Sequence, residues 1–325
     1  MPVDLVTGTR SDAFAPLTSE LLAVSDGHHV HVESVGRVGG IPAVYLHGGP
    51  GSGCQADHRR LFDPERFHAV LFDQRGAGRS RPKGLRDHNT LAHLIADMEM
   101  IREKFSFERW MVVGGSWGAT LALAYAQAHP DRVLGIVLRA TFLGTRDELD
   151  GAFLKMLPRF YPALSEDFLG LLPGNERMQP LESYWRRILD SDATVHGPFA
   201  RAWHDTERIL SEVSPSRTRL DLTSLKSTGP LPATPFMEAH YFVNDCFMRP
   251  NQLLKDAGQL KGIPGVIVQG RYDLLCPPAT SHALAARWAD AELRIVEGAG
   301  HTLYDPGVRN AVMKGIADVE SKISG

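Results

Sequence analysis

The sequence has little of what marks membrane, disulfide-rich or nucleic-acid-binding proteins. No run of about 18 apolar residues occurs, so no bilayer-spanning helix is predicted. The three cysteines are far apart and odd in number, which excludes a disulfide framework and a C-x-x-C metal pair and favours a reducing compartment. A formal net charge of −3, without runs of Lys or Arg, gives no electrostatic case for nucleic acid or a membrane surface. We expect a cytoplasmic protein that acts on a small molecule.

The start of the chain, MPVDLVTGTRSDAF, likewise lacks the apolar core of a signal peptide. What is present is a chain of 325 residues, of which 43% are apolar. That length and composition suit one large domain that carries an insertion.

Short apolar runs that end in glycine-rich loops alternate with helical patterns. Runs typical of buried parallel strands lie at 43–46, 69–72, 110–113, 134–138, 265–269 and 293–296, after a half-exposed strand at 29–34. Helical patterns lie at 89–105, where Asn89 is the expected N-cap, at 118–129 and near 308–319. Such alternation predicts an α/β fold with a mostly parallel central sheet and right-handed crossovers.

One segment breaks the alternation. From residue 147 to residue 251 the sequence is helical, aromatic and interrupted by prolines, without short apolar strands. The sequence therefore predicts a core in two parts, 1–146 and 252–325, with an inserted helical cap of residues 147–251.

The motif Gly114-Gly115-Ser116-Trp117-Gly118 lies between a predicted strand and a predicted helix. A serine exposed on a sharp strand-to-helix turn needs small neighbours, and the helix behind it directs N–H groups at the site. This pattern is typical of the nucleophile elbow of the α/β-hydrolase fold, and Ser116 is the predicted nucleophile. The alternative, a bare Gly/Ser turn, is disfavoured by the position between strand and helix.

A serine nucleophile needs a base, and in this fold an acidic residue and then a histidine follow on loops after later strands. Asp273 comes after the strand at 265–269, and His301 comes after the strand at 293–296. We expect His301 to take the Ser116 proton and Asp273 to hold the histidine tautomer.

The oxyanion hole is expected to combine the N–H of Trp117 with that of Gly49, in the loop HGGPG after the strand at 43–46. The next loop, 73–80, carries charges that we expect to brace its neighbours rather than to take part in the chemistry.

Several strings together resemble the proline iminopeptidases (prolyl aminopeptidases) of the α/β-hydrolase fold: HGGPG, FDQRGAGRS, GGSWGATLALAYAQAHP, GRYDLLCP and VEGAGH. The likeness runs from about residue 44 to the C-terminus, and Ser116, Asp273 and His301 match the family's triad. The resemblance implies a serine exopeptidase that releases N-terminal proline, or a similar small residue, from short peptides through an acyl-enzyme.

In that family, cap carboxylates hold the free α-amino group of the substrate. The segment MEAHYF is similar to the family's I-E-x-H-Y-F, which implies this role for Glu238. The segment AWHDTE is similar to A-W-x-x-W-E, which implies the same role for Glu207. The pattern departs at Thr206, where the family has Trp, and at Arg208, where it has Gly.

The resemblance also implies residues that border the substrate. The segment LRATF is similar to the family's L-R-G-I-F, whose Arg and Phe fall on Arg139 and Phe142. An aromatic wall residue falls on Phe153, although the spacing near Gly144 differs from the family's by about one residue.

Physical chemistry supports a ligand role for the two glutamates. A carboxylate placed under a helical cap without a partner would cost several kcal/mol in lost hydration, and a substrate ammonium is a suitable partner. The alternative is that Glu207 and Glu238 pair with Arg201, Arg208 or Arg249, or face solvent.

No metal or organic cofactor is predicted, because His47, beside the oxyanion loop, lacks the spacing of a metal pair. Two other functions stay open. An esterase or amidase acting on another small acyl group would use the same triad. A non-catalytic binding protein on this fold would be expected to have lost triad or oxyanion residues, and this chain keeps them all.

Overall fold

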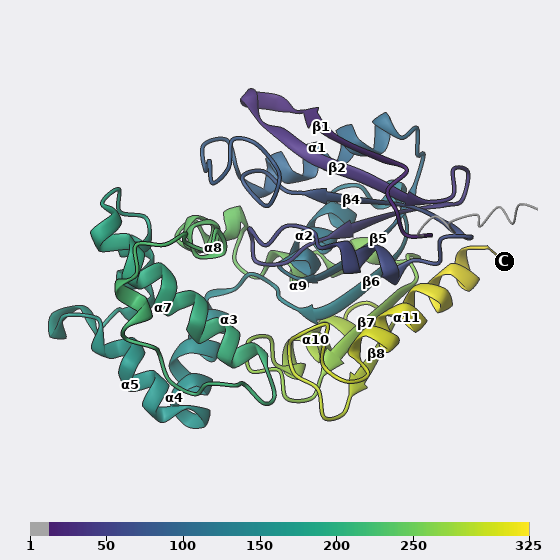
Figure 1. The fold of residues 1–325 in the computed structure, drawn as a ribbon. Helices are drawn as coiled ribbons and strands as arrows, with labels where there is room; N and C mark the ends of the chain where they lie inside the picture. Colours follow the sequence, from purple (N-terminus) through teal and green to yellow (C-terminus); the bar gives the residue numbers. More distant parts are fainter. Residues whose placement is uncertain (1–12, 325) are drawn as a thin grey trace, which may run out of the picture.

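A computed structural model describes residues 13–324, in which eight strands form one central sheet (Figure 1). Their order across the sheet is β1-β2-β4-β3-β5-β6-β7-β8. The strands are β1 Thr18–Ala23, β2 His29–Gly36, β3 Ile41–Leu46, β4 Phe67–Asp73, β5 Trp110–Ser116, β6 Val133–Thr141, β7 Gly265–Gly270 and β8 Ala291–Val296. Strands β3 to β8 pair in parallel, whereas β2 pairs antiparallel with β1 and β4. The predicted fold class is confirmed.

The expectation about a signal peptide rests mostly on residues 1–12, which lie outside the described residues. Within the described part of the chain, no helix has the length and apolar character needed to cross a membrane.

The central parallel strands β4, β5 and β7 are buried on both faces because helices cover both sides of the sheet, whereas the edge strand β8 is partly exposed. Val112 of β5 packs in one hydrophobic core with the helices α1 (Leu91–Lys104) and α2 (Trp117–Ala128). Its neighbours Met111 and Val113 point to the opposite face, into a second core with α11 (Val308–Ile323). This period of two explains why the strands appear in the sequence as short, continuous apolar runs.

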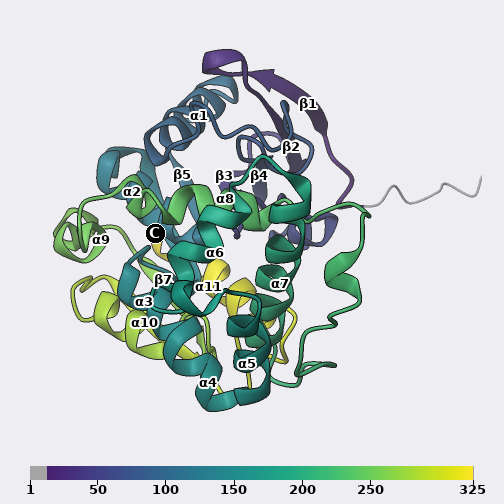
Figure 2. The same cartoon turned by 90° about the vertical axis from the view of Figure 1, so that its left-hand side faces the viewer.

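Between β6 and β7 the described residues form helices and loops without a strand. The α-helices are α3 Arg146–Asp150, α4 Leu157–Phe160, α5 Pro162–Gly170, α6 Pro180–Ile188, α7 Ala193–Ser211, α8 Thr234–Phe242 and α9 Gln252–Lys255, and a π-helical turn spans Gly151–Met156. Figure 2 shows α6, α7 and α8 lying in front of the strands. The insertion thus lies over the end of the sheet at which β5 terminates. Its exact boundaries at 147 and 251 stay a prediction.

Aromatic side chains hold the inserted helices together. Phe153 stacks on Trp203, with ring centroids 4.2 Å apart, and Phe168 stacks on Tyr184 at 3.9 Å. All four rings are buried, so they form an apolar core between the inserted helices.

The expected N-cap of α1 is wrong by one residue. Thr90, not Asn89, is the N-cap, and its hydroxyl accepts a hydrogen bond from the N–H of His93. The side chain of Asn89 is buried instead, where it donates to the carbonyl of Arg75 and accepts from the Tyr241 hydroxyl. A tertiary partner therefore draws Asn89 away from the local capping role.

Two elements were not predicted. The strand β1 is mostly exposed at the sheet edge, and α10 (Pro278–Ala285) lies between β7 and β8. Neither has a long apolar run, so neither gave a strong periodic signal.

Candidate active site

Ser116 lies at the junction of β5 and α2, in the sharp turn expected from its motif. Its backbone has φ 57° and ψ −123°, a conformation that non-glycine residues rarely adopt. The turn is also tightly packed. A Cβ on Gly114 would lie 2.3 Å from the carbonyl oxygen of Gly118, and a Cβ on Gly118 would lie 2.1 Å from that of Leu46. Both glycines are thus required by close backbone approaches.

His301 and Asp273 lie side by side, on the loops after β8 and β7. The Nδ1 atom of His301 is 2.9 Å from Oδ2 of Asp273 and 3.1 Å from Oδ1. The buried Asp273 carboxylate also accepts the backbone N–H groups of Leu275 and Cys276. With Nδ1 donating to Asp273, Nε2 is the ring nitrogen left to accept a proton from a nucleophile.

A cavity of about 310 Å³ brings most of the predicted site together. Its lining includes Ser116, His301, Gly49, Arg139, Glu207 and Glu238. The Arg139 guanidinium donates to the backbone carbonyl of His301, so this arginine supports the histidine loop as well as lining the cavity.

A smaller cavity of about 30 Å³ adjoins Ser116 and contains the remaining pocket residues. Phe142, Phe153 and Phe242 line it together with Ser116 and Glu207. It is a mainly apolar space beside the serine, with a carboxylate at its border.

The oxyanion loop is fixed by the backbone conformation of Gly49 and by the side chain of Gln74. Gly49 adopts φ +105°, and a Cβ there would lie 2.6 Å from the backbone nitrogen of Gly51. Gln74 joins this loop to the elbow: its side chain donates to the His47 carbonyl and accepts the Trp117 indole N–H. As the first residue of α2, Trp117 has a backbone N–H without a partner inside the helix.

The charges of the loop 73–80 behave as braces, as expected. Arg75 is buried and forms a two-pronged pair with Asp97, both N···O distances being 2.7 Å. Arg79 pairs in turn with Asp73 and Glu33. The sequence analysis missed Gln74, the residue of this loop that contacts the elbow.

Glu207 on α7 and Glu238 on α8 face the same cavity. Glu238 is fully buried, and its Oε2 accepts the Trp203 indole N–H at 2.6 Å. Its other oxygen, Oε1, has no hydrogen-bond partner among the described residues other than the neighbouring carboxyl group of Glu207. Burial raises the pKa of Glu238 well above its usual range, and the neighbouring Glu207 charge raises it further. Burial also raises the pKa of Glu207.

The alternative pairing of these glutamates with arginines is wrong. Arg201 donates to backbone carbonyls of the segment 227–230, Arg208 lies 3.9 Å from Glu212, and Arg249 pairs with Asp256. The pair therefore has no compensating arginine of this set.

Two histidines that the sequence analysis did not single out, His58 and His204, also line the main cavity. Burial is the main cause that lowers both pKa values, for His58 to about 4. Both are therefore neutral near pH 7 and supply no positive charge to the glutamates.

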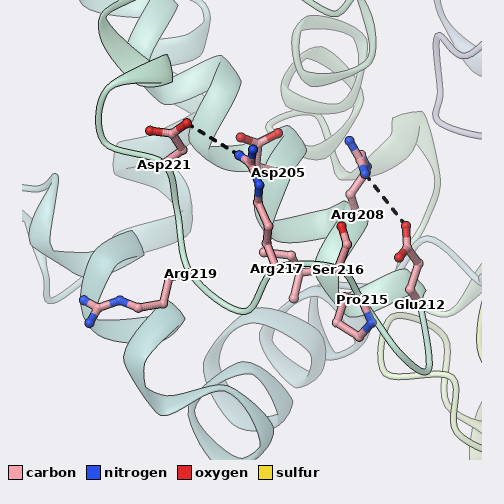
Figure 3. Close-up of a pocket in the computed structure, with 9 residues that line it drawn as sticks. Asp205, Arg208, Glu212, Pro215, Ser216, Arg217, Arg219 and Asp221 are labelled. Atoms are coloured by element: carbon pink, nitrogen blue, oxygen red, sulfur yellow. Dashed lines mark hydrogen bonds and ion pairs between the residues drawn. The ribbon is translucent and has the colours of Figure 1, made fainter.

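A second polar cavity, of about 300 Å³, lies at the end of α7 and shares Arg208 with the main cavity (Figure 3). Its cations are matched by anions: Arg217 pairs with Asp221, and Arg208 lies near Glu212. No histidine or cysteine is among its lining residues, so it offers no base or thiol for catalysis.

Comparisons with known proteins agree with this geometry. A family model described as alpha/beta hydrolase fold matches residues 42–308. A proline iminopeptidase of Arabidopsis thaliana is 41% identical over 300 residues, covering 90% of this chain and 77% of that protein. One from Xylella fastidiosa is 41% identical over 295 residues, covering 90% and 93%. The solved structure of a proline iminopeptidase-related protein from Thermus thermophilus has a TM-score of 0.64 at 21% identity, covers 94% of this chain and 98% of its own, and supports the fold.

Proposed function

The chain belongs to the proline iminopeptidase family of α/β hydrolases and is a hydrolase of the prolyl aminopeptidase type, and from this premise we propose how its residues divide the reaction. Ser116 is the nucleophile, His301 the general base and acid, and Asp273 the residue that orients the histidine. The substrate is a short peptide with a free N-terminus.

The reaction proceeds in two halves. The Ser116 oxygen attacks the carbonyl carbon of the first residue while its proton passes to Nε2 of His301. The developing oxyanion receives hydrogen bonds from the N–H groups of Gly49 and Trp117. His301 then returns the proton to the leaving amine, and an acyl-enzyme remains. Water, deprotonated by the same histidine, releases the residue and restores Ser116.

One observation supports the aminopeptidase assignment: two neighbouring carboxyl groups, Glu238 fully buried and Glu207 partly buried, line the cavity that contains Ser116 without a cation among the described residues to pair with them. Burial raises the pKa of each acid, and the neighbouring Glu207 charge raises that of Glu238 further, because two adjacent acids without a cation are unfavourable when both are ionised. A substrate α-ammonium at this position would supply the missing positive charge and the missing hydrogen-bond donors. Glu207 and Glu238 therefore recognise the amine.

The small cavity beside Ser116 accounts for the preference for proline. Phe142 and Phe153 give it apolar walls, against which the apolar ring of proline would pack. Arg139 borders the main cavity, where it also holds the carbonyl of His301.

The inserted helices limit the length of the substrate. We propose that residues 147–251 act as a cap that admits only the ends of peptides to Ser116. The cytoplasmic location remains a prediction from the sequence.

The test compares three chromogenic substrates of the purified protein: Pro-anilide, Ala-anilide and N-acetyl-Pro-anilide. We expect Pro-anilide to be cleaved best, Ala-anilide less well and the blocked substrate very poorly, because its amide brings no positive charge to the glutamates. Efficient cleavage of the blocked substrate would contradict the role of the glutamates. It would favour an esterase or amidase that uses the same triad.

A further inference from the structure

Three side chains with metal-binding atoms converge on the surface of the sheet domain, and none of them lines the cavity that contains Ser116. Asp26 lies in the turn Ser25–Gly27 between β1 and β2. His88 lies in the loop before α1, and His93 lies in the first turn of that helix. Their ligand atoms are all within 4.8 Å of one another.

The distances are close to those of a metal centre. Oδ2 of Asp26 is 3.6 Å from Nε2 of His93, and Oδ1 is 3.8 Å from Nδ1 of His88. Ligand atoms about 2.1 Å from a tetrahedral zinc ion lie roughly 3.4 Å from one another. Side-chain rotations that bring the two histidine nitrogens closer to one carboxylate oxygen would complete the geometry.

The ring of His93 is already oriented for metal binding. Its Nδ1 lies 2.8 Å from the Thr90 hydroxyl oxygen. When Nδ1–H donates to that oxygen, the Nε2 lone pair faces Asp26. Metal-binding histidines typically have such a partner on the other ring nitrogen.

One cation lies nearby and has to be accounted for. Nη1 of Arg75 is 3.6 Å from Oδ2 of Asp26. The charge of Arg75 is matched by its two-pronged pair with Asp97. Arg75 also donates to the Ser25 hydroxyl and to the His88 carbonyl, so it holds the turn and the loop against each other. It thereby brings Asp26 and His88 toward each other before any ion arrives.

We propose that Asp26, His88 and His93 form a binding site for one divalent transition-metal ion, with Zn²⁺ as the best match to two imidazoles and a carboxylate. The side chains of Asp26 and His88 are well exposed, at 34% and 60%, so water can complete the coordination. The ion would connect the β1–β2 turn to the start of α1. The site is independent of the hydrolytic reaction.

The experiment is a calorimetric titration of the untagged protein with Zn²⁺. We expect saturable binding of one ion per chain and, for Asp26→Asn and His93→Gln, a dissociation constant raised at least about tenfold. The control is His282→Gln, which removes an exposed histidine on α10 and should leave binding unchanged.

Two further measurements identify the ligands and the structural effect. Co²⁺ bound by the wild type should give the visible absorption of a site with nitrogen and oxygen ligands, and His93→Gln should lose it. Zn²⁺ should raise the unfolding temperature of the wild type and of His282→Gln, but not of the two ligand variants. Absence of saturable binding up to about 1 mM Zn²⁺, a weak regime for a specific site, would overturn the proposal. So would binding that survives both ligand substitutions.

Discussion

The backbone N–H of His301 donates a hydrogen bond to the carbonyl oxygen of Ser211, with 3.1 Å between the nitrogen and the oxygen. Ser211 is the last residue of α7, the helix that carries Glu207. Arg139, on β6, holds the carbonyl of the same histidine. The proposed base is thus fixed on one side by the helical insertion and on the other by the sheet. The helix that carries the proposed amine-binding Glu207 is therefore hydrogen-bonded to the loop of the proposed base.

Ser116→Ala is expected to lower kcat/KM for Pro-anilide by roughly 10⁴-fold or more, because only binding and the oxyanion hole remain. His301→Ala should have nearly the same effect. Circular dichroism and thermal unfolding should show that both variants fold. A folded Ser116→Ala protein that keeps a tenth of wild-type turnover would contradict the assignment of the nucleophile.

Gly118→Ala should abolish activity by distorting the elbow, since its methyl group would lie 2.1 Å from the Leu46 carbonyl oxygen. The matched control is Gly170→Ala, in the last turn of α5, where no atom lies within 4 Å of the added methyl group. Alanine in a helix is favoured over glycine by up to roughly 0.5–1 kcal/mol, so the control should be at least as stable as the wild type and fully active. Unfolding free energies and Pro-anilide turnover measure both effects. Equal activity of the two variants would contradict the packing argument.

The three members of the proposed triad could be located from the sequence because each follows a strand in a fixed order. Ser116 sits in a local motif whose glycines are required by close contacts, and Asp273 and His301 are marked by their positions after β7 and β8. These sequence signals depend on neighbouring residues only, so contacts between distant segments do not alter them. The sheet could be predicted for the same reason, since alternate strand residues enter two cores.

Contacts between distant segments could not be predicted in this way. In the sequence Asn89 matches the pattern of an N-cap. In the structure its side chain instead accepts a hydrogen bond from the hydroxyl of Tyr241, which belongs to the insertion. The Trp203 indole that holds Glu238 likewise comes from another helix. The cluster of Asp26 with two histidines joins a turn to a helix far along the chain, and only the fold brings them together.

Cys276 offers a test of the small cavity. Its thiol borders the cavity beside Ser116, and burial, followed by the Asp273 charge, raises its pKa well above the usual range. The reactive thiolate is therefore scarce at neutral pH, and a bulky thiol reagent should inactivate the wild type slowly and faster as the pH rises. Cys276→Ala should be active and resistant to the reagent.

The control for this experiment is Cys246→Ala, because Cys246 is buried and lines neither cavity around Ser116. That variant should remain as sensitive as the wild type. A folded but inactive Cys276→Ala protein would mean that the thiol has a role in the reaction.

Glu238→Gln should change the pH dependence of stability. The pKa of Glu238 is raised in the folded protein, so the folded state binds more protons than the unfolded state between the two pKa values. Stability is then present below the unfolded pKa and is lost as the pH rises through the folded one. Glutamine cannot ionise, and its amide oxygen can still accept the Trp203 N–H. Compared with the wild type, the variant should therefore gain in unfolding temperature from about pH 5 to about pH 8.

The matched control for stability is Glu166→Gln, on an exposed position of α5. Its unfolding temperature should follow that of the wild type at every pH. A difference between Glu238→Gln and the wild type that does not change with pH would contradict the buried, proton-binding state of this side chain.

The same substitution tests what the carboxyl pair recognises. If Glu207 and Glu238 hold the α-ammonium, Glu238→Gln removes a charge-assisted hydrogen bond worth roughly 1.5 to 3 kcal/mol, about a tenfold to hundredfold drop in kcat/KM for Pro-anilide. Hydrolysis of a small ester without an amine should change little, because Ser116 and His301 are untouched. Since the pKa of each glutamate is raised, amine-bearing substrates should also lose kcat/KM as the pH falls through the range in which the pair takes up protons, and the ester should lack this loss. Equal losses on both substrates would assign Glu238 a structural role instead, because only a group that touches the amine can distinguish a substrate that has one from a substrate that does not.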